Sequence, residues 1–474
     1  MAQARSTDKD WARAEFGAAQ LGDKRRTARL VQLAQHLGER PEVSLPQALE
    51  QTAALKAAYR FFDNADIAHE SVLAPHVVSS IRRMHGEPLV LAVQDTSYLD
   101  YATHPATEAL GPLNAGGGHG MIMHSTLALT PERLPLGVVS LRLWARDAAK
   151  PRSRASRRTR PIKDKESHKW IESVEAVAQL KAQLPGTRFI SVADRESDVF
   201  EFLLAAQKLG VDVLVRAAYD RNLIGAEAPL FATLASAPLL AHKALALPAR
   251  GKRKARTAKL EIRACPLVLH APANGTARAL PPLALWGVWA YEPEAPQDAE
   301  PVDWKLLTSV LVVSAEDALE RLDWYAACWG IEQWHKILKD GCRIEMRQLQ
   351  SAERLKRLIT LYAVIAWRIF YATLLARLVP DMACTAFLQQ EEWEALYCRI
   401  HHTPIPVAIP PPLRQAVRWI ARLGGFLGRP GDGEPGSKTL WRGFQHLIAM
   451  TEMYRIMKPH VAPHLIHQKD VGKD

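Results

Sequence analysis

The sequence predicts an α/β core that is interrupted by a β-rich insertion and flanked by helical regions at both ends. Three observations support this fold class. The first 75 residues have helical periodicity, and the following residues alternate short apolar runs with helical segments. Residues from about 220 to 305 form successive strand-like runs, and helical patterns return after about residue 315.

These patterns divide the chain into three predicted segments. They are a helical N-terminal segment, residues 1–75, an α/β core, residues 76–375 with the insertion at about 220–305, and a helical C-terminal segment, residues 376–474. The length of 474 residues fits two to four domains. A composition of 48% hydrophobic and 23% charged residues excludes disordered and collagen-like classes.

The N-terminal segment contains a predicted helix that starts after Asp23, a suitable capping residue, and ends near Gly38. Its apolar stripe consists of Leu30, Leu33, Ala34 and Leu37, and Arg25, Arg29, Gln32 and His36 form a neighbouring stripe. Arg and Gln on one helix face suit contacts to DNA phosphates and base edges. The alternative is a solvated basic face.

Two strand-like runs of the core end in an acidic residue. They are EPLVLAVQD, which ends at Asp95, and TRFISVAD, which ends at Asp194. HSTLALT and LGVVSLRLW, between them, read as further strands. Because ligand sites form at the carboxyl ends of strands in open α/β sheets, Asp95 and Asp194 are candidate site residues.

A third acid lies on a predicted helix, WYAACWGIEQWHKILKDG. Helical spacing places five residues on one side of this helix: Tyr325, Cys328, Glu332, Lys336 and Lys339. Ala327, Ile331, Trp334 and Leu338 form a separate apolar face. Glu332 can therefore face a site while the helix packs through its other side.

Three carboxylates without His or Cys suit a hard cation such as Mg²⁺ or Mn²⁺. Two such ions can activate water and stabilise a leaving oxygen in phosphodiester cleavage. On spacing alone, the alternative remains that these acids are solvated or cap helices.

Other features narrow the class of protein. The apolar stretch 358–379 contains Arg368 and Arg377, so it is predicted to be a buried core helix, and no membrane association is expected. Five cysteines and a charged N-terminus without a signal-peptide pattern indicate a reducing, cytoplasmic location. The glycines of AGGGHG lack a following Lys-Ser/Thr, so no nucleotide cofactor is expected.

The charge indicates a polyanionic partner. Lys and Arg number 61 against 50 Asp and Glu, which gives a formal net charge of +11. Two basic runs, at 150–165 and 250–259, are predicted to be solvated loops that meet DNA phosphates.

Several motifs in order along the chain resemble one known family. They are DWARAEF, LGDKRRTARLV, AAYRF, QDT, ADRESD, Y-x2-C-x3-E-x6-K and ARLGGF. They are similar to the cut-and-paste DDE transposases of bacterial insertion sequences, in the IS4-like group that carries a Y-R-E-K signature. The resemblance runs from about residue 10 to about residue 455.

The resemblance implies a ribonuclease H-like catalytic core in which Asp95, Asp194 and Glu332 hold two Mg²⁺ ions, with Mn²⁺ as a substitute. It implies cleavage of double-stranded DNA at the transposon's terminal repeats through a hairpin intermediate, and strand transfer into target DNA. It further implies a homodimer in the synaptic complex and a cytoplasmic, nucleoid-associated location.

The resemblance also assigns roles in DNA binding. Tyr325 and Lys339 match signature residues that contact end phosphates, and Trp304 matches an aromatic residue that stacks on a flipped base. Arg216 matches an Arg near the DNA end, and Arg25, Arg26 and Arg29 fall in the end-recognition region. Without the resemblance, Trp304 reads as a core residue.

One position departs from the family pattern, because Cys328 stands where the signature has Arg. A thiol cannot make the charged, bidentate phosphate contact that Arg makes. Either Lys336 or an Arg elsewhere compensates, or this copy is an impaired transposase that acts as a DNA-end-binding protein or inhibitor. A carboxylate-based glycosidase is a further alternative, although it needs none of the basic features.

Overall fold

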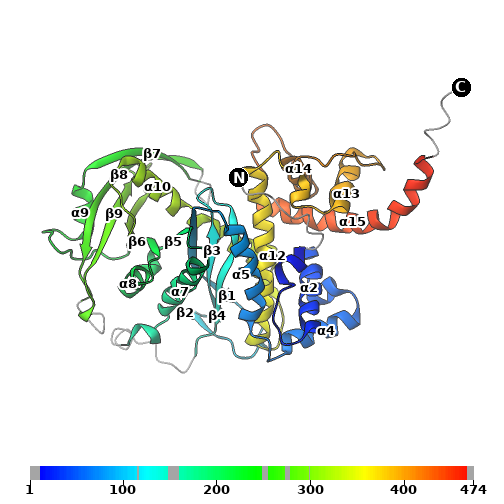
Figure 1. The fold of residues 1–474 in the computed structure, drawn as a ribbon, viewed down its shortest axis with the longest axis horizontal. Helices are drawn as coiled ribbons and strands as arrows, with labels where there is room; N and C mark the ends of the chain where they lie inside the picture. Colours follow the sequence, from blue (N-terminus) through cyan, green and yellow to red (C-terminus); the bar gives the residue numbers. More distant parts are fainter. Residues whose placement is uncertain are drawn as a thin grey trace. The chain divides into compact units, whose positions relative to one another are not determined.

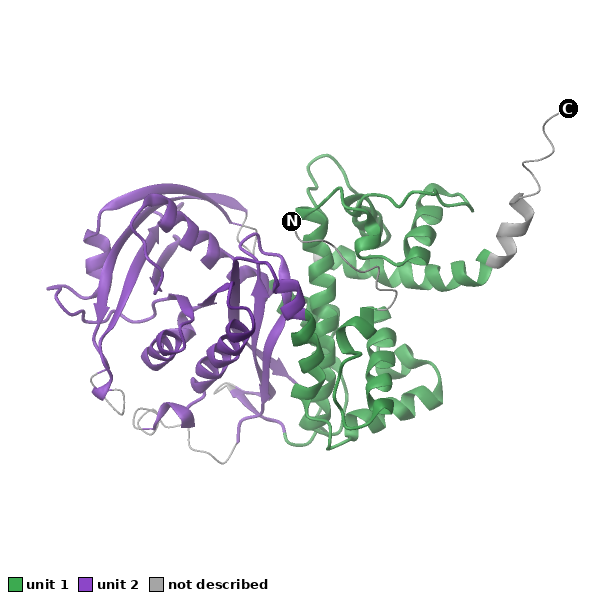
Figure 2. Ribbon diagram, in the orientation of Figure 1, with its two compact units in different colours: residues 1–79, 103–109, 333–474 green, residues 80–102, 110–332 purple. Residues whose placement is uncertain are grey.

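The computed structural model describes residues 11–114, 117–147, 160–247, 255–272, 278–297 and 299–466. The chain forms two compact units, which Figure 2 shows in different colours. Unit 1 consists of residues 1–79, 103–109 and 333–474, and unit 2 consists of residues 80–102 and 110–332. The N-terminal and C-terminal helical segments thus belong to one compact unit. The division into three domains with separate functions stays a prediction.

Unit 2 is built on one mixed sheet (Figure 1). Its strands are β1 (Leu89–Asp100), β2 (Gly111–Asn114), β3 (Gly117–Leu129), β4 (Pro135–Trp144), β5 (Arg188–Ala193), β6 (Asp212–Arg216), β7 (Leu239–Leu247), β8 (Arg256–Leu269), β9 (Leu283–Tyr291) and β10 (Asp303–Thr308). The strand order is β2-β3-β1-β5-β6-β10-β9-β8-β7, and β4 also pairs with β3.

The centre of the sheet has the arrangement expected of a ribonuclease H-like core. Strand β3 runs antiparallel to both of its neighbours, β4 and β1, whereas β5 pairs in parallel with both β1 and β6. The buried run 90–93 of β1 contains only apolar residues, as a central strand covered on both faces requires. The predicted α/β class is confirmed.

The β-rich insertion does not form a separate sheet. Strand β10 pairs antiparallel with β6 on one side and with β9 on the other, and β8 and β7 follow in order. The insertion therefore extends the core sheet from its β6 edge. Strand β7 at the new edge alternates exposed and partly buried residues, as an edge strand with one solvated face does.

Helices cover this sheet. They are α7 (His168–Gln183), α8 (Phe200–Lys208), α9 (Leu230–Ser236), α10 (Ala315–Ala326) and α11 (Cys328–Lys336), with short 3₁₀ turns at Ile162–Asp164 (η1) and Arg195–Ser197 (η2). Helix α7 packs on β1, β3, β4 and β5 and against α8, while α10 crosses β5 to β9. Trp170 and Val174 of α7 are buried against the sheet.

Unit 1 is helical. It contains α1 (Trp11–Phe16), α2 (Lys24–Glu39), α3 (Leu45–Leu49), α4 (Thr52–Asp63), most of α5 (His69–Met84), a π-helical turn η4 (Ile337–Gly341), 3₁₀ turns η5 (Ile344–Met346) and η6 (Cys384–Ala386), α12 (Ala352–Leu378), α13 (Gln390–His401), α14 (Leu413–Leu423) and α15 (Ser437–Ile466). Helix α12 contacts α2, α4, α14 and α15, so both ends of the chain pack on it.

Helix α12 confirms the predicted core helix. Among the described residues it alone is long and apolar enough to cross a membrane, yet 83% of its apolar window is buried. Burial all round explains its nearly continuous apolar sequence, because a helix enclosed by others needs no polar face.

The predicted N-terminal helix is also confirmed. Asp23 caps α2 by accepting a hydrogen bond from the backbone N–H of Arg25 at 2.8 Å. The predicted apolar stripe, Leu30, Leu33, Ala34 and Leu37, is at most 1% exposed.

The C-terminal helices pack closely through small residues. A Cβ added to Gly443 of α15 would lie 1.8 Å from the carbonyl oxygen of Ile420 on α14. Only glycine permits this approach, and the contact fixes α15 against α14.

Arg357 of α12 forms hydrogen bonds with the N-terminal part of unit 1. Its side chain is buried and donates to the carbonyl oxygens of Phe62, at 3.0 Å, and Ile67. We expect Arg357→Met to leave these two acceptors unpaired and to lower the free energy of unfolding of unit 1 by about 2–4 kcal/mol. Urea unfolding followed by circular dichroism measures this.

The neighbouring Lys356→Met is the control, since the side chain of Lys356, among the residues that the structure describes, pairs only with Glu353 at i,i+3. It should cost about 1 kcal/mol or less. Equal losses for the two variants would show that the buried hydrogen bonds of Arg357 contribute little.

Candidate functional site

Asp95 and Asp194 lie next to each other because β1 and β5 pair in parallel. The last pair in this register is Gln94 with Ala193, so each acid directly follows it on its own strand. Asp95 was predicted to end its strand, and this is wrong, since β1 continues to Asp100. The reason is that β3 continues to pair with β1 beyond the end of β5, with Asp100 opposite Gly120.

Glu332 lies on α11 and is exposed. The single predicted helix through residues 324–341 is wrong: α10 ends at Ala326, α11 starts at Cys328, and the chain from Ile337 to Gly341 forms a π-helical turn. The break is a tight turn, in which the N–H of Ala327 bonds the carbonyl of Trp324 and the N–H of Gly330 bonds that of Ala327. The predicted apolar face is nevertheless buried, with Ala327, Ile331, Trp334 and Leu338 at most 1% exposed.

The charges of all three acids act on one group, the thiol of Cys328. Burial raises the pKa of this thiol well above its ordinary value, and the negative charges of Asp95, Asp194 and Glu332 each raise it further. Three separate elements, β1, the end of β5 and α11, therefore direct carboxylates toward one side chain of unit 2. The thiol stays protonated and supplies no charge to balance them.

The pKa of the Asp194 carboxyl also reflects the proximity of other acids. Although the residue as a whole is exposed, burial of its carboxyl raises its pKa to about 6. The charges of Asp95 and Glu196 add to this rise, while Lys169 and a hydrogen bond from the N–H of Glu196, at 2.9 Å, oppose it. Adjacent carboxylates without a cation between them repel, which disfavours the ionised form.

Tyr325 and Arg216 belong to the same cluster. Burial raises the pKa of the Tyr325 hydroxyl, as does the nearby Cys328, and a hydrogen bond with Arg216 opposes the rise. Arg216, at the end of β6, also donates to the carbonyl oxygen of Asp303 at 2.7 Å. Both residues were predicted to contact DNA, and the structure places them beside the acids.

Trp304 lies in β10 and is 9% exposed. Its ring meets Tyr325 edge-on at 5.1 Å and Trp329 at 6.2 Å between centroids. In this structure Trp304 is thus an aromatic core residue at the border of the acid cluster, and its predicted stacking on a flipped base requires these neighbours to move.

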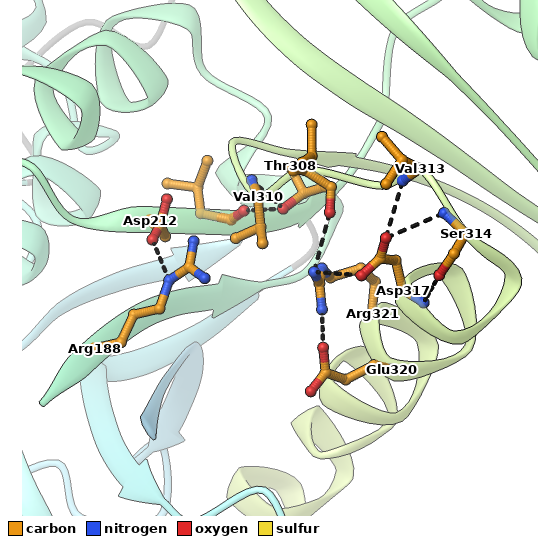
Figure 3. A network of polar contacts seen from close by, with 11 residues as sticks. Arg188, Asp212, Thr308, Val310, Val313, Ser314, Asp317, Glu320 and Arg321 are labelled. Carbon is orange, nitrogen blue, oxygen red and sulfur yellow. Dashed lines mark hydrogen bonds and ion pairs between the residues drawn. The ribbon is translucent and has the colours of Figure 1, made fainter. Parts of the chain in front are cut away.

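A polar network fixes the start of α10, the helix that carries Tyr325 (Figure 3). Ser314 and Asp317 form a capping box, and Asp317 also accepts from the N–H of Val313 at 3.0 Å. Buried Arg321 donates to the carbonyl oxygen of Leu311 at 3.0 Å and pairs with Glu320. These contacts anchor α10 just beyond the end of β10.

The acid cluster suits a hard divalent cation. The candidate ligands would be carboxylate oxygens of Asp95, Asp194 and Glu332, and a bound cation would oppose the burial and repulsion that raise the pKa of Asp194. Among the described residues, no group of three or more His, Cys, Asp or Glu side chains is arranged so that it could hold a metal ion without further ligands or movement. Mg²⁺ is commonly held by one or two carboxylates plus waters and substrate phosphates, so such a site can be completed by a phosphate ligand.

The predicted basic residues of α2 differ in their surroundings. Arg25 is largely exposed and pairs with Asp23 at 2.9 Å. Arg26 holds the fold of unit 1 instead, because it pairs with Asp66 at 2.9 Å and donates to the carbonyl oxygen of Leu21. Arg29 is half-buried on the same helix.

The remaining predicted lysines fall in unit 1. Lys336 ends α11 and is exposed, whereas Lys339 lies in the π-helical turn and pairs with Glu345 at 3.1 Å. Neither therefore belongs to the compact unit that holds the three acids.

Much of the two basic runs lies outside the described residues, namely 150–159 and 250–254, as do residues 115 and 116 of the glycine-rich segment. For the second run, a solvated loop is wrong at its described end, because Arg256 is in β8 and pairs with buried Glu292. The described end of the first run, residues 160–165, is a partly exposed segment with a 3₁₀ turn, and Lys169, beyond this run, is buried in α7.

Lys169 is a site residue that the sequence did not single out. Its ammonium lies 3.3 Å from Glu196, and its positive charge lowers the pKa of Asp194. The signal available in the sequence was the apolar pattern of Trp170, Ile171 and Val174, which marks a helix rather than a loop.

Comparison with known protein families gives two matches. Residues 8–67 match the Transposase DNA-binding family, and residues 364–461 match the Transposase Tn5 dimerisation domain. The first contains Arg25, Arg26 and Arg29, and the second contains most of α12 and all of α13 and α14. Because a transposase DNA-binding region and a Tn5-type dimerisation region lie at opposite ends of one α/β chain, the two matches support an IS4-like insertion-sequence transposase.

Proposed function

We propose that this transposase cleaves DNA at transposon ends in a metal-dependent reaction and joins the freed ends to target DNA. The observations that carry the proposal are the β1–β5 register, which places Asp95 beside Asp194, and the charges of Asp95, Asp194 and Glu332, which all act on the thiol of Cys328. Mg²⁺ or Mn²⁺ ions held by these carboxylates would activate water and stabilise the leaving oxygen of a phosphodiester.

The chain's own side chains position the DNA. The hydroxyl of Tyr325 and the guanidinium of Arg216 lie close to each other beside the acids, and both can turn toward a phosphate oxygen. Trp304, next to Tyr325, is available for stacking on an unpaired base once its aromatic neighbours separate. These roles support cleavage through a hairpin, in which a base is displaced from the duplex.

The dimerisation match supports dimer formation. Helix α15 presents Met453, Ile456 and Met457, each about half exposed or more, at spacings of three and one. This exposed apolar stripe fits a helix that packs on a second copy, as a synaptic pair of protomers requires.

A second candidate function is a catalytically impaired copy that binds transposon ends and blocks them. The observation that favours it is the neutral thiol of Cys328 among three acids, where the family signature has a permanent positive charge.

Neutralising any one acid should stop cleavage without stopping DNA binding. We expect Asp95→Asn, Asp194→Asn and Glu332→Gln each to reduce Mg²⁺-dependent nicking of a duplex carrying the element's terminal repeat by about 10³-fold or more. Each variant removes a carboxylate and keeps the side chain's shape. Gel-based nicking assays and fluorescence anisotropy with the same duplex measure the two properties.

Asp100→Asn is the matched control, because Asp100 lies further along the same strand and its amide oxygen can still accept from the N–H of Ala102. It should nick at the wild-type rate. Nicking by the three site variants at the wild-type rate, or wild-type nicking in excess EDTA, would refute metal-dependent catalysis at this site.

Restoring the signature charge should increase activity. We expect Cys328→Arg to raise the rate of end cleavage about tenfold or more, since a charged hydrogen bond to a phosphate is worth about 1.5–3 kcal/mol. Cys328→Ser, which adds no charge, should leave the rate unchanged. If Cys328→Arg and wild type cleave equally, the missing charge does not limit this enzyme.

A further inference from the structure

We propose that unit 1 contains a second DNA-contact site, a pocket that binds backbone phosphates of duplex DNA through Lys336, Arg343, Lys438 and Arg442. The inference rests on the proposed transposase function and extends it to a surface of which only Lys336 was among the predicted DNA contacts. The pocket is a cavity of about 520 Å³ that lies entirely within unit 1.

Three segments far apart in the sequence line this cavity. They are the loop after α2, the stretch around the π-helical turn, and the first turns of α15, which together contribute Glu42, Lys336, Asp340, Arg343, Lys438, Trp441, Arg442 and Gln445. Trp441 forms a buried wall, and its indole lies so close to Gly341 that a Cβ there would be 3.0 Å from the ring. The π-helical turn and α15 are therefore packed directly together.

The charges in the pocket are not balanced. Four basic side chains face two acids, Glu42 and Asp340, which leaves a net charge of +2. Within the described residues, none of the four cations forms a hydrogen bond or ion pair through its side chain. By contrast, buried Arg347, only four residues after Arg343, donates to the carbonyl oxygen of Cys342 at 2.5 Å.

The four positive side chains repel one another because they have no negative partners among the described residues, so binding of an anion in the pocket is favourable. The side chains of Lys336, Arg343, Lys438 and Arg442 are all on exposed residues, which lets them reach a ligand outside the protein. Arg343 has a left-handed backbone with φ of 50°, an unfavourable conformation for a residue with a Cβ. Lys438 and Arg442 are one turn apart near the N-terminus of α15, where the helix dipole also favours negative charge.

DNA phosphate is the ligand that these groups fit best. Lys and Arg side chains contact phosphates without reading the base sequence, and the chain already carries a DNA-binding region. A free nucleotide would need an aromatic face for its base, but Trp441 is 7% exposed and its ring is covered by Gly341. The pocket thus favours the backbone of a duplex.

The position of the pocket has a consequence for assembly. Lys438, Trp441 and Arg442 lie within the matched dimerisation region, residues 364–461, so this region contacts DNA as well as a second copy. DNA bound there stabilises the start of α15, the same helix that carries the exposed apolar stripe Met453, Ile456 and Met457.

The salt dependence of DNA binding tests the proposal. Binding of the full-length protein to the terminal-repeat duplex and to an unrelated duplex is measured by fluorescence anisotropy for wild type and Lys438→Ala/Arg442→Ala. Loss of two phosphate contacts should reduce the slope of log K against log salt by about 1.8 on both duplexes. Between about 50 mM and about 200 mM salt, wild type should therefore lose about tenfold more affinity than the double variant.

Arg422→Ala is the matched control for charge, because Arg422 is an exposed arginine of the same unit that lies outside the pocket. It should leave the slope unchanged, and equal melting temperatures should show that all variants are folded. An unchanged slope in the double variant, or an equal reduction in the double variant and Arg422→Ala, would overturn the proposal.

Two further results separate this proposal from its rivals. If inorganic phosphate raises the melting temperature of wild type but not of the double variant, while DNA binding is the same, the pocket holds a free anion and the proposal is wrong. If wild type binds neither duplex, both the proposed transposase function and the phosphate-binding pocket are refuted. If wild type binds DNA but the double variant has the wild-type salt slope, only the pocket is refuted.

Discussion

The parallel pairing of β1 with β5 is the constraint on which the candidate site depends. This register places Asp95 and Asp194 side by side, directly after Gln94 and Ala193. The cost of this proximity is visible in the pKa of Asp194, which burial and the charge of Asp95 raise to about 6. A buried central strand, the anchored helix α10 and the short turn to α11 then bring Cys328 and Glu332 to the same place. Carboxylates held close together in this way are what the proposed cation site requires.

The basic side chains of the described residues fall into two groups, those that stabilise the fold and those that remain available to bind an anion. Many of the excess positive charges serve the fold: Arg26, Arg256, Arg321 and Arg357 all have carboxylate or carbonyl partners. Others in the described residues, such as Lys336, Arg343, Lys438 and Arg442, have no such partner and gather around one cavity. The net charge of +11 therefore says little by itself, and what matters is which cations the fold leaves available.

Elements with strong local signals could be predicted from the sequence. The cap at Asp23, the stripe of α2 and the apolar helix α12 follow from capping and periodicity, and the structure has all three. The lengths of β1 and of the helix through Glu332 could not be predicted in this way. Strand β1 continues past Asp95 because β3 pairs with it. The helix is interrupted at Ala327 by the hydrogen bonds of a tight turn, and no residue type in this segment indicates such a turn. The ionic role of Lys169 and the pocket around Arg343 depend on tertiary contacts between distant segments, which a pattern along one segment does not contain.

The central claim is that Asp95, Asp194 and Glu332 together hold divalent cations at the DNA end. Anomalous X-ray diffraction from crystals of the protein bound to a terminal-repeat duplex in Mn²⁺ tests it most directly. We expect two anomalous peaks within about 4 Å of each other, each within bonding distance of these carboxylates and of a DNA phosphate. Full occupancy of the DNA with no peak at the three carboxylates would contradict it.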